Sequence, residues 1–248
     1  MNETIHLLQN RRSTRVFNEQ PIEKEVLDEI LKAAQQAPNS INAQQTSLIV
    51  IQDKETLQKI EEVCGGFAKV ARAQAFIVIA MDFHKTEVAI QAQGEEQEIH
   101  NHLEGLLVGA VDAGIMSEAI SVAAESFGIG STIIGAIRNQ PQFMIDLCQL
   151  PTHTYPLIGV MLGYPEGELG NPKIRLPKET FIHQETYQSE GMLEAIQTYD
   201  AQLDEYNEAR NLSHLPNYSQ QVTALYSQKN KRQNAVRSTL EGQGFSFH

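Results

Sequence analysis

Residues 103–127, which read LEGLLVGAVDAGIMSEAISVAAESF, form the longest strongly patterned stretch of the chain. Apolar residues occur nearly all round the corresponding helix, which predicts a buried position. Small residues recur through the stretch and would let another helix approach closely: Gly105, Gly109, Ala110, Ala113, Gly114, Ala119, Ala123 and Ala124. Glu104, Asp112, Glu118 and Glu125 interrupt it. We therefore expect a helix of a soluble core or a subunit interface, not a membrane span.

Apolar runs on both sides of this stretch predict the strands of a buried sheet. Residues 47–51 (SLIVI) and 75–80 (AFIVIA) are almost continuously apolar, as in strands that are covered on both faces. Residues 128–138 and 155–165 also read as strands, and the second of these ends in a turn. No G-x-G-x-x-G pattern opens a helix after a strand, so a Rossmann dinucleotide domain is not supported.

Helical spacing of apolar residues predicts helices at residues 3–10, with Thr4 as N-cap, and from Pro21 to near Pro38. Further helices are expected at 54–63, 141–147, 193–210 and 219–242. The Gln- and Glu-rich residues 84–101 predict an exposed helix or loop. His100 and His102 are two residues apart and would point to different helix faces, so we expect solvated histidines and no metal site.

The composition restricts the function classes. The chain has 248 residues, of which 41% are hydrophobic and 20% charged, as in an ordinary soluble globular protein. Its formal net charge of -12 argues against nucleic acid or an anionic membrane as a partner. Cys64 and Cys148 form no CxxC motif, which is typical of a reducing compartment without disulfides or zinc. We see no signal-peptide pattern and no apolar run near the roughly 20 residues of a membrane span, so we expect a cytoplasmic protein.

Two basic segments stand out in this acidic chain. Residues 11–15 (RRSTR) follow the first expected helix, and residues 173–177 (KIRLP) lie in the last third. The planar fork of Arg offers two parallel N–H donors to a phosphate, so we interpret the two segments as parts of one phosphate site. The alternative is a solvated basic turn in each place, which a helix C-terminus alone would favour for the first.

Four motifs in register resemble the nitroreductase family, most closely its larger, NADPH-dependent nitro/flavin reductase branch. They are Arg11-Arg12-Ser13-x-Arg15, Pro38-x-Ser40-x-Asn42-x-Gln44, Ile134-Gly135 after the small-residue helix, and Lys173-x-Arg175-Leu176-Pro177. The resemblance implies an α+β sandwich, in which helices flank a mostly antiparallel sheet, and an intertwined homodimer. It also implies a single FMN-binding domain over residues 1–248 with a C-terminal helical excursion at about 190–248.

The resemblance also implies a tightly bound FMN and assigns residues to it. Those that would hold its phosphate and ribityl chain are Arg11, Arg12, Ser13, Arg15, Lys173 and Arg175. Ser40, Asn42 and Gln44 would reach the flavin of the other subunit. Ile134 and Gly135 would lie over the isoalloxazine ring, with the Gly135 N–H near flavin N5. The flavin would carry the chemistry, so we assign no catalytic acid, base or nucleophile.

The implied function is an FMN-dependent NAD(P)H oxidoreductase with a ping-pong mechanism. NADPH or NADH would give a hydride to flavin N5 and leave. A small aromatic acceptor, such as a nitroaromatic, a quinone, an azo compound or a free flavin, would then take the electrons. Two alternatives remain open: specialised flavin chemistry on the same fold, and a flavin-binding storage or regulatory protein without enzyme activity.

Departures from the branch concern the cofactor contacts. Phe67 stands where the branch commonly has a Gln that touches the cofactor, and Ile174 replaces the first proline of a KPRLP motif. Arg210 is the candidate for the 2′-phosphate of NADPH, but residues 212–216 offer only His214 in its support. A 2′-phosphate contact is typically worth more than one charged hydrogen bond, at ~1.5–3 kcal/mol each. We therefore expect weak discrimination between the donors, with NADH also used.

Overall fold

The computed structural model describes residues 2–66, 69–227 and 231–247. In the last of these ranges, side chains are described from residue 235 onward. Phe67 lies outside the described residues. The chain forms two compact units, Met1–Gly170 with Asn234–His248 and Asn171–Gln233. The second unit thus begins before residue 190, and the end of the chain belongs to the first unit. The single-domain organisation over residues 1–248 stays a prediction.

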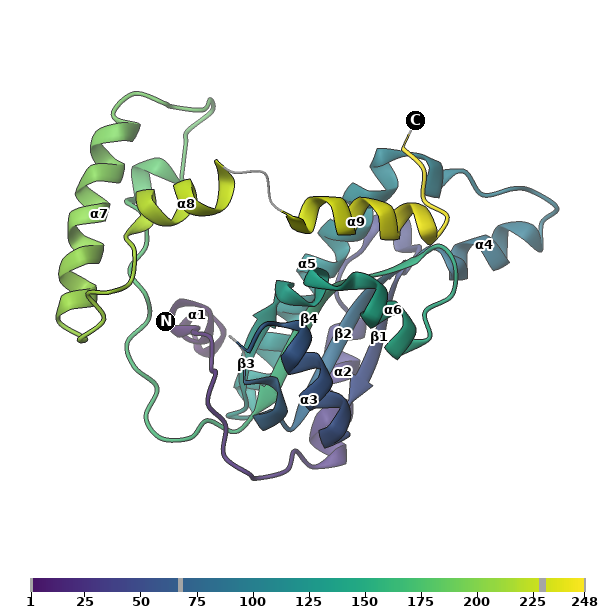
Figure 1. Cartoon of the computed structure of the whole chain (residues 1–248), viewed down its shortest axis with the longest axis horizontal. Helices are drawn as coiled ribbons and strands as arrows, with labels where there is room; N and C mark the ends of the chain where they lie inside the picture. Colours follow the sequence, from purple (N-terminus) through teal and green to yellow (C-terminus); the bar gives the residue numbers. More distant parts are fainter. Residues whose placement is uncertain (1, 67–68, 228–230, 248) are drawn as a thin grey trace. The chain divides into compact units, whose positions relative to one another are not determined.

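The first unit is built on an antiparallel sheet with the strand order β1-β2-β4-β3 (Figure 1). The strands in the described part of the chain are β1 (Thr46–Ile51), β2 (Ala75–Asp82), β3 (Gly130–Ile134) and β4 (Thr154–Gly163). Each neighbouring pair is antiparallel. This confirms the expected mostly antiparallel sheet.

Strand β2 separates two hydrophobic cores, because its alternate side chains point to opposite faces of the sheet. Ile77 and Met81 belong to the core formed with α2 (Lys24–Gln35) and α5 (Leu103–Ser126). Phe76 and Val78 belong to the core formed with α3 (Lys54–Val63) and α6 (Pro141–Cys148). Helices therefore cover both faces of the sheet (Figure 1), which confirms the α+β sandwich.

Strand β1 differs from the expectation that residues 47–51 are buried on both faces. Among the strands that the structure describes, it lies at the edge of the sheet and pairs only with β2. Most of its side chains are half-buried, and Val50 is 37% exposed. An apolar run alone does not distinguish a central strand from an edge strand, because that difference depends on pairing with distant residues.

Helix α5 confirms the core helix expected from residues 103–127. It packs against α2 and against strands β2, β3 and β4. Gly109 permits this packing, because a Cβ there would lie 2.3 Å from the Met81 Sδ. By length and composition, α5 is the one helix among the described residues that could span a membrane, contrary to our expectation of no such run. Its packing on the sheet and its buried Asp112 are those of a core helix.

Two element boundaries differ from the sequence expectation. Helix α1 (Glu3–Asn10) is capped by Asn2, whose side chain accepts a hydrogen bond from the Ile5 N–H, and not by Thr4. The strand expected over residues 128–138 ends at Ile134, where a 3₁₀ turn (Gly135–Asn139) begins. Asn and Thr are both good N-caps, so the sequence left the choice open.

The polar segment 84–101 contains the exposed helix α4 (His84–Gln91), as expected. His100, however, is not a solvated histidine. Its ring stacks on that of His153 with centroids 4.0 Å apart. The Nδ1 atom of His153 lies 2.9 Å from the Glu87 carboxylate. Burial lowers the pKa of His100, and the neighbouring His153 adds to this effect. No group of three or more metal-ligating side chains occurs among the described residues.

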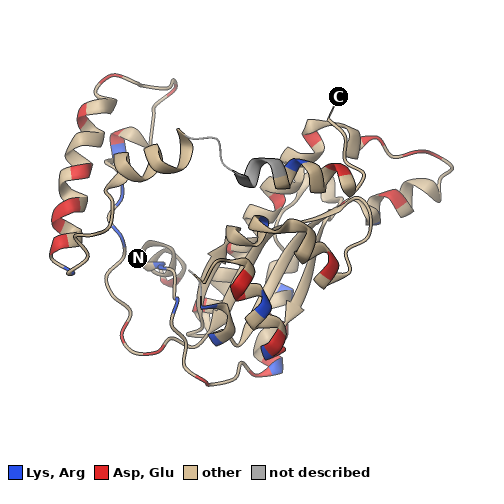
Figure 2. Ribbon diagram, in the orientation of Figure 1, with Lys and Arg blue, Asp and Glu red and all other residues tan. Residues whose placement is uncertain are grey.

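The second unit contains α7 (Met192–Glu208) and α8 (Tyr218–Tyr226). The next helix, α9 (Lys231–Gly242), continues into the first unit. There, Leu240 of α9 and Phe245, which lies beyond the end of the helix, belong to the hydrophobic core. The single helix expected at residues 219–242 is therefore two helices. Acidic residues follow one another along α7 (Figure 2).

Candidate functional site

The first basic segment, residues 11–15, leaves the end of α1 and runs beside β3. The Thr14 N–H donates to the Ser131 carbonyl at 2.8 Å, and the Thr132 hydroxyl donates to the Thr14 carbonyl at 2.6 Å. Gly130 makes room for this approach, because a Cβ there would lie 2.4 Å from the Thr14 hydroxyl oxygen. The strand thus fixes the backbone at the centre of the segment, with the Thr14 side chain buried.

The three arginines of this segment have different surroundings. Arg11 Nε lies 3.2 Å from the Glu118 carboxylate of α5. Arg12 is half-buried, and its Nε atom is buried without a hydrogen-bond partner among the described residues. Arg15 is exposed and has no ion-pair partner in the described part of the chain. Arg15 is therefore the arginine most available to an anion from solvent.

A second carboxylate of α5, Glu125, lies behind the arginines. Burial raises its pKa, and the positive charges of Arg11 and Arg12 partly oppose that rise. Glu125 and Arg12 line a cavity of about 220 Å³ together with Thr14 and Gly130 of the strand contact. The first basic segment is thus backed by two acidic side chains, which offset part of its positive charge.

The polar segment expected at residues 39–44 forms a tight turn with an unusual backbone. Ile41, Asn42 and Gln44 have positive φ angles of 47°, 57° and 55°. The Asn39 carboxamide stabilises the turn, because its oxygen accepts from the Gln44 N–H at 3.0 Å. Positive φ is uncommon for residues other than glycine and costs most for a β-branched residue such as Ile41.

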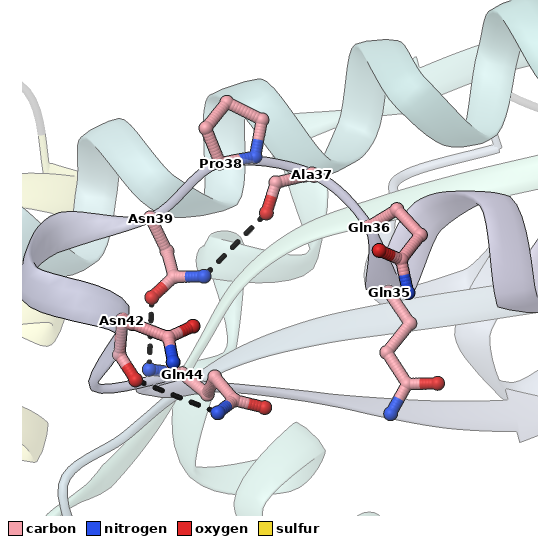
Figure 3. A pocket seen from close by; sticks show the side chains of 7 residues that line it. All are labelled: Gln35, Gln36, Ala37, Pro38, Asn39, Asn42 and Gln44. Atoms are coloured by element: carbon pink, nitrogen blue, oxygen red, sulfur yellow. Dashed lines mark hydrogen bonds between the residues drawn. The ribbon is translucent and has the colours of Figure 1, made fainter.

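Amide side chains of this turn line a cavity of about 430 Å³ (Figure 3). Its lining residues are Gln35, Gln36, Ala37, Pro38, Asn39, Asn42 and Gln44. Two of the three predicted site residues of this segment, Asn42 and Gln44, are among them, whereas Ser40 is not. Carboxamides offer both donors and acceptors, so the cavity suits a neutral polar group such as an amide or a heterocycle edge.

Asp112 of α5 is a residue of this region that the sequence did not single out. It is 4% exposed. Its carboxylate accepts from the Gln45 side-chain amide at 2.5 Å and from the Ser40 N–H at 3.3 and 3.4 Å. Burial raises the pKa of Asp112, and the hydrogen bond from Ser40 opposes the rise. A carboxylate within an apolar helix was the available signal, but its partners are 67 and 72 residues away.

Ile134 and Gly135 lie where β3 ends and the following 3₁₀ turn begins. The Ile134 side chain is buried. A Cβ at Gly135 would lie 3.2 Å from the Arg138 guanidinium, which in turn donates to the Leu157 carbonyl. Gly135 therefore keeps a close approach between the turn and Arg138.

The second basic segment lies in the second unit and is held by tyrosines of α7. The Tyr199 hydroxyl donates to the Ile174 carbonyl at 3.0 Å, and the Tyr206 hydroxyl lies 3.4 Å from the Pro172 carbonyl. Lys173 and Arg175 are exposed and have no carboxylate partner within the described residues. The tyrosines hold the backbone of this segment and leave its cations available.

Arg210, the candidate for the 2′-phosphate of NADPH, lies just beyond α7. Its guanidinium lies over the Tyr206 ring, 4.9 Å from the centroid. It also donates to the Tyr206 hydroxyl and, at 3.5 Å, to the Asn171 carbonyl. The side chain remains exposed, but part of its donor capacity is used within its own unit.

Comparison with known proteins gives matches along almost the whole chain. Residues 8–164 match the nitroreductase family, and residues 173–248 match the nitroreductase family C-terminal domain. A relative from Bacillus subtilis (strain 168), named FMN reductase (NAD(P)H), is 41% identical over 248 residues, which cover 99% of this chain and 98% of the relative.

Solved structures agree with these matches. NfrA2 of B. megaterium has a TM-score of 0.95 at 38% identity, with 100% of each chain covered. The hypothetical oxidoreductase YcnD from Bacillus subtilis has a TM-score of 0.94 at 41% identity, again over 100% of each chain. The family resemblance carried by the four sequence motifs is thereby confirmed: the chain belongs to the nitroreductase family.

Proposed function

We propose that this protein is an FMN-dependent NAD(P)H oxidoreductase acting on nitroaromatic, quinone, azo or flavin acceptors. The observation that carries the proposal is the 41% identity, over 99% of the chain, to a protein named FMN reductase (NAD(P)H). Bound FMN would accept a hydride from NADPH or NADH and pass the electrons to the acceptor. The residues of the chain bind and orient the cofactor.

The described donors fit the chemistry of FMN. A phosphate dianion requires charge-assisted donors, and Arg15 is an exposed arginine without an ion-pair partner among the described residues. The Arg12 Nε is a buried donor that lacks a partner there. We therefore propose the N-terminal segment, with Arg11 and Ser13, as phosphate and ribityl ligands. We propose Lys173 and Arg175 as further phosphate ligands, supported by their exposure and by the family motif.

The remaining proposed ligands would contact the ring. Ser40, Asn42 and Gln44 are proposed to hydrogen-bond the polar edge of the flavin of the other subunit. The carboxamides of Asn42 and Gln44, which line the 430 Å³ cavity, support this proposal. Ile134 and Gly135 are proposed to lie against the ring face, and Gly135 offers its backbone N–H without a side chain.

We further propose a homodimer of single-domain chains in the cytoplasm. Leu103, Leu107 and Val111 form one stripe on α5 and are 57%, 54% and 60% exposed. A stripe of this kind on a core helix is suited to burial against a second subunit. Cys64 and Cys148 are both free thiols, which suits a reducing compartment.

An anaerobic visible spectrum, titrated with NADPH and separately with NADH, tests the function. We expect a flavin absorption that bleaches with donor and recovers when a quinone or nitroarene is added. A flavin absorption that neither donor bleaches would favour the storage or regulatory alternative, and a protein that takes up no FMN would overturn the proposal.

The donor preference is tested by kcat/KM for NADPH and NADH measured side by side. We propose similar values, because Arg210 is the candidate 2′-phosphate ligand and residues 212–216 add no Lys or Arg. Arg210→Gln should raise KM for NADPH and leave KM for NADH unchanged. A strong preference of the wild-type protein for NADPH would contradict this expectation.

A further inference from the structure

The Asp112 carboxylate connects helix α5 to both ends of the polar turn. At the start of the turn it accepts from the backbone N–H of Ser40, and at the end it accepts from the side chain of Gln45. These two residues enclose the turn that carries Asn42 and Gln44. A carboxylate held within an apolar helix is costly unless it is hydrogen-bonded, so the two contacts keep Asp112 and the turn together.

The turn needs such a restraint because its backbone is strained. Three of its residues have positive φ without being glycine, and one of them is Ile41. Conformations of this kind persist only where the surroundings over-determine them. The Asn39–Gln44 hydrogen bond closes the turn internally, and Asp112 attaches both ends of the turn to helix α5.

Gln45 is itself firmly placed. It is 1% exposed, and its carbonyl accepts from the Asp82 N–H at 3.0 Å. Its side-chain oxygen is buried without a partner in the described part of the chain. The side chain therefore has one anchoring bond, which is the one to Asp112.

We propose that Asp112 is a positioning residue for flavin binding: it fixes the turn at residues 40–45 so that Asn42 and Gln44 present their side chains to the flavin. This inference rests on the proposed function. It assigns Asp112 no contact with the flavin, because its carboxylate is already used by Ser40 and Gln45.

Two substitutions of Asp112 distinguish its proposed role in positioning the turn from simple filling of space in the core. Asp112→Leu keeps a side chain of similar size in an apolar helix but leaves the Ser40 N–H and the Gln45 amide without an acceptor. Asp112→Asn keeps both contacts, because its oxygen can accept from Ser40 and its amide can donate to the free oxygen of a flipped Gln45 side chain. Glu104→Gln, an exposed change on the same helix, is the matched control for lost charge.

The test measures the Kd for FMN by fluorescence quenching, the visible circular dichroism of the bound flavin, and the thermal midpoint of the apoprotein. We expect FMN binding to weaken about tenfold or more in Asp112→Leu, since losing the partner of buried donors is costly, and to stay within about threefold of wild type in Asp112→Asn and Glu104→Gln. The visible circular dichroism should change in Asp112→Leu and be restored in Asp112→Asn, which a loss of stability alone would not produce.

Wild-type affinity and circular dichroism in a folded Asp112→Leu protein would overturn the inference while leaving the proposed function intact. A wild-type protein that binds no FMN would instead overturn the proposed function. If Asp112→Leu does not fold, Gln45→Leu decides, because it removes one anchor and leaves the bond from Ser40. We expect weaker FMN binding in Gln45→Leu, and unchanged binding there would reject the inference.

Discussion

The two basic segments carry the same kind of side chain but are held in different ways. The first is bonded along β3, and its Arg11 and Arg12 face Glu118 and Glu125 of α5. The second is held through backbone carbonyls by the tyrosines of α7. Its cations have no carboxylate partner among the residues that the structure describes.

The difference indicates where uncompensated positive charge is available to a phosphate. In the first segment, acidic residues offset part of the charge, and Arg15 is the arginine left exposed. In the second segment, Lys173 and Arg175 both remain exposed. Such local sites matter in a chain with a formal net charge of -12, whose overall field repels anions.

The largest expected effect is that of Arg15→Gln. We expect FMN affinity to fall about 10- to 100-fold, since hydrogen bonds to charged groups contribute ~1.5–3 kcal/mol. Riboflavin affinity should not change, because riboflavin has no phosphate. Arg11→Gln is the comparison variant and should cost less, because Arg11 already pairs with Glu118. Equal losses of FMN affinity in the two variants would show that pairing with Glu118 makes no difference to what Arg11 contributes.

Loss of either cation of the second segment should have the next largest effect. Lys173→Gln and Arg175→Gln should each weaken FMN binding by about tenfold and leave riboflavin binding unchanged. Lys178→Gln, which removes an exposed positive charge a few residues away, is the matched control. Unchanged FMN affinity in both variants would contradict a phosphate-binding role and would support the alternative that residues 173–177 form a solvated basic turn.

A smaller effect is expected when the support of the second segment is removed. Tyr199→Phe deletes the hydroxyl that donates to the Ile174 carbonyl, and one such bond contributes about 0.5–1.5 kcal/mol. We expect FMN affinity to fall a few-fold and the thermal midpoint to drop slightly. Tyr226→Phe, at an 83% exposed tyrosine, should change neither quantity. If Tyr199→Phe behaves like that control, the tyrosine does not order the segment.

The smallest effect concerns the acidic support of the first segment and depends on pH. Burial raises the pKa of Glu125 above its ordinary value of 4.5, so the folded state binds more protons than the unfolded state in the window above pH 4.5. The contribution of Glu125 to stability therefore falls as pH rises through that window.

Glu125→Gln removes this dependence. The free energy of unfolding of the variant, minus that of wild type, should increase between pH 4.5 and pH 7, with a slope no steeper than about 1.4 kcal/mol per pH unit. Denaturant titrations of the two apoproteins at matched pH values measure it. A difference that stays constant or decreases as pH rises would mean that ionised Glu125 is not penalised behind the arginines.

Local pattern predicted much of the fold. The apolar run of β2, the apolar spacing of α3 and the long run of apolar and small residues in α5 predicted the correct elements, because each element carries its signal within its own residues. The prediction that β1 is buried on both faces was wrong, since strand order depends on pairing between distant segments. The stacked pair of His100 and His153 was missed for the same reason, because the two rings come from separate elements of the fold.

The candidate site divides in the same way. The arginine segment and the amide turn were predicted from short motifs, whose residue types fit a phosphate and a polar heterocycle. Asp112 could not be predicted, because its role depends on contacts with Ser40 and Gln45 across 72 and 67 residues. The difference between Arg11 and Arg15 likewise depends on Glu118, which the sequence does not place beside either of them.

The affinity of the apoprotein for FMN and for riboflavin, measured by fluorescence quenching under identical conditions, tests the central claim most directly. The two ligands share the ring and ribityl chain and differ only in the phosphate. If the basic segments bind that phosphate, FMN should bind at least about 100-fold more tightly than riboflavin, as expected for more than one charge-assisted hydrogen bond. Equal affinities would contradict the account and leave both segments as solvated basic turns.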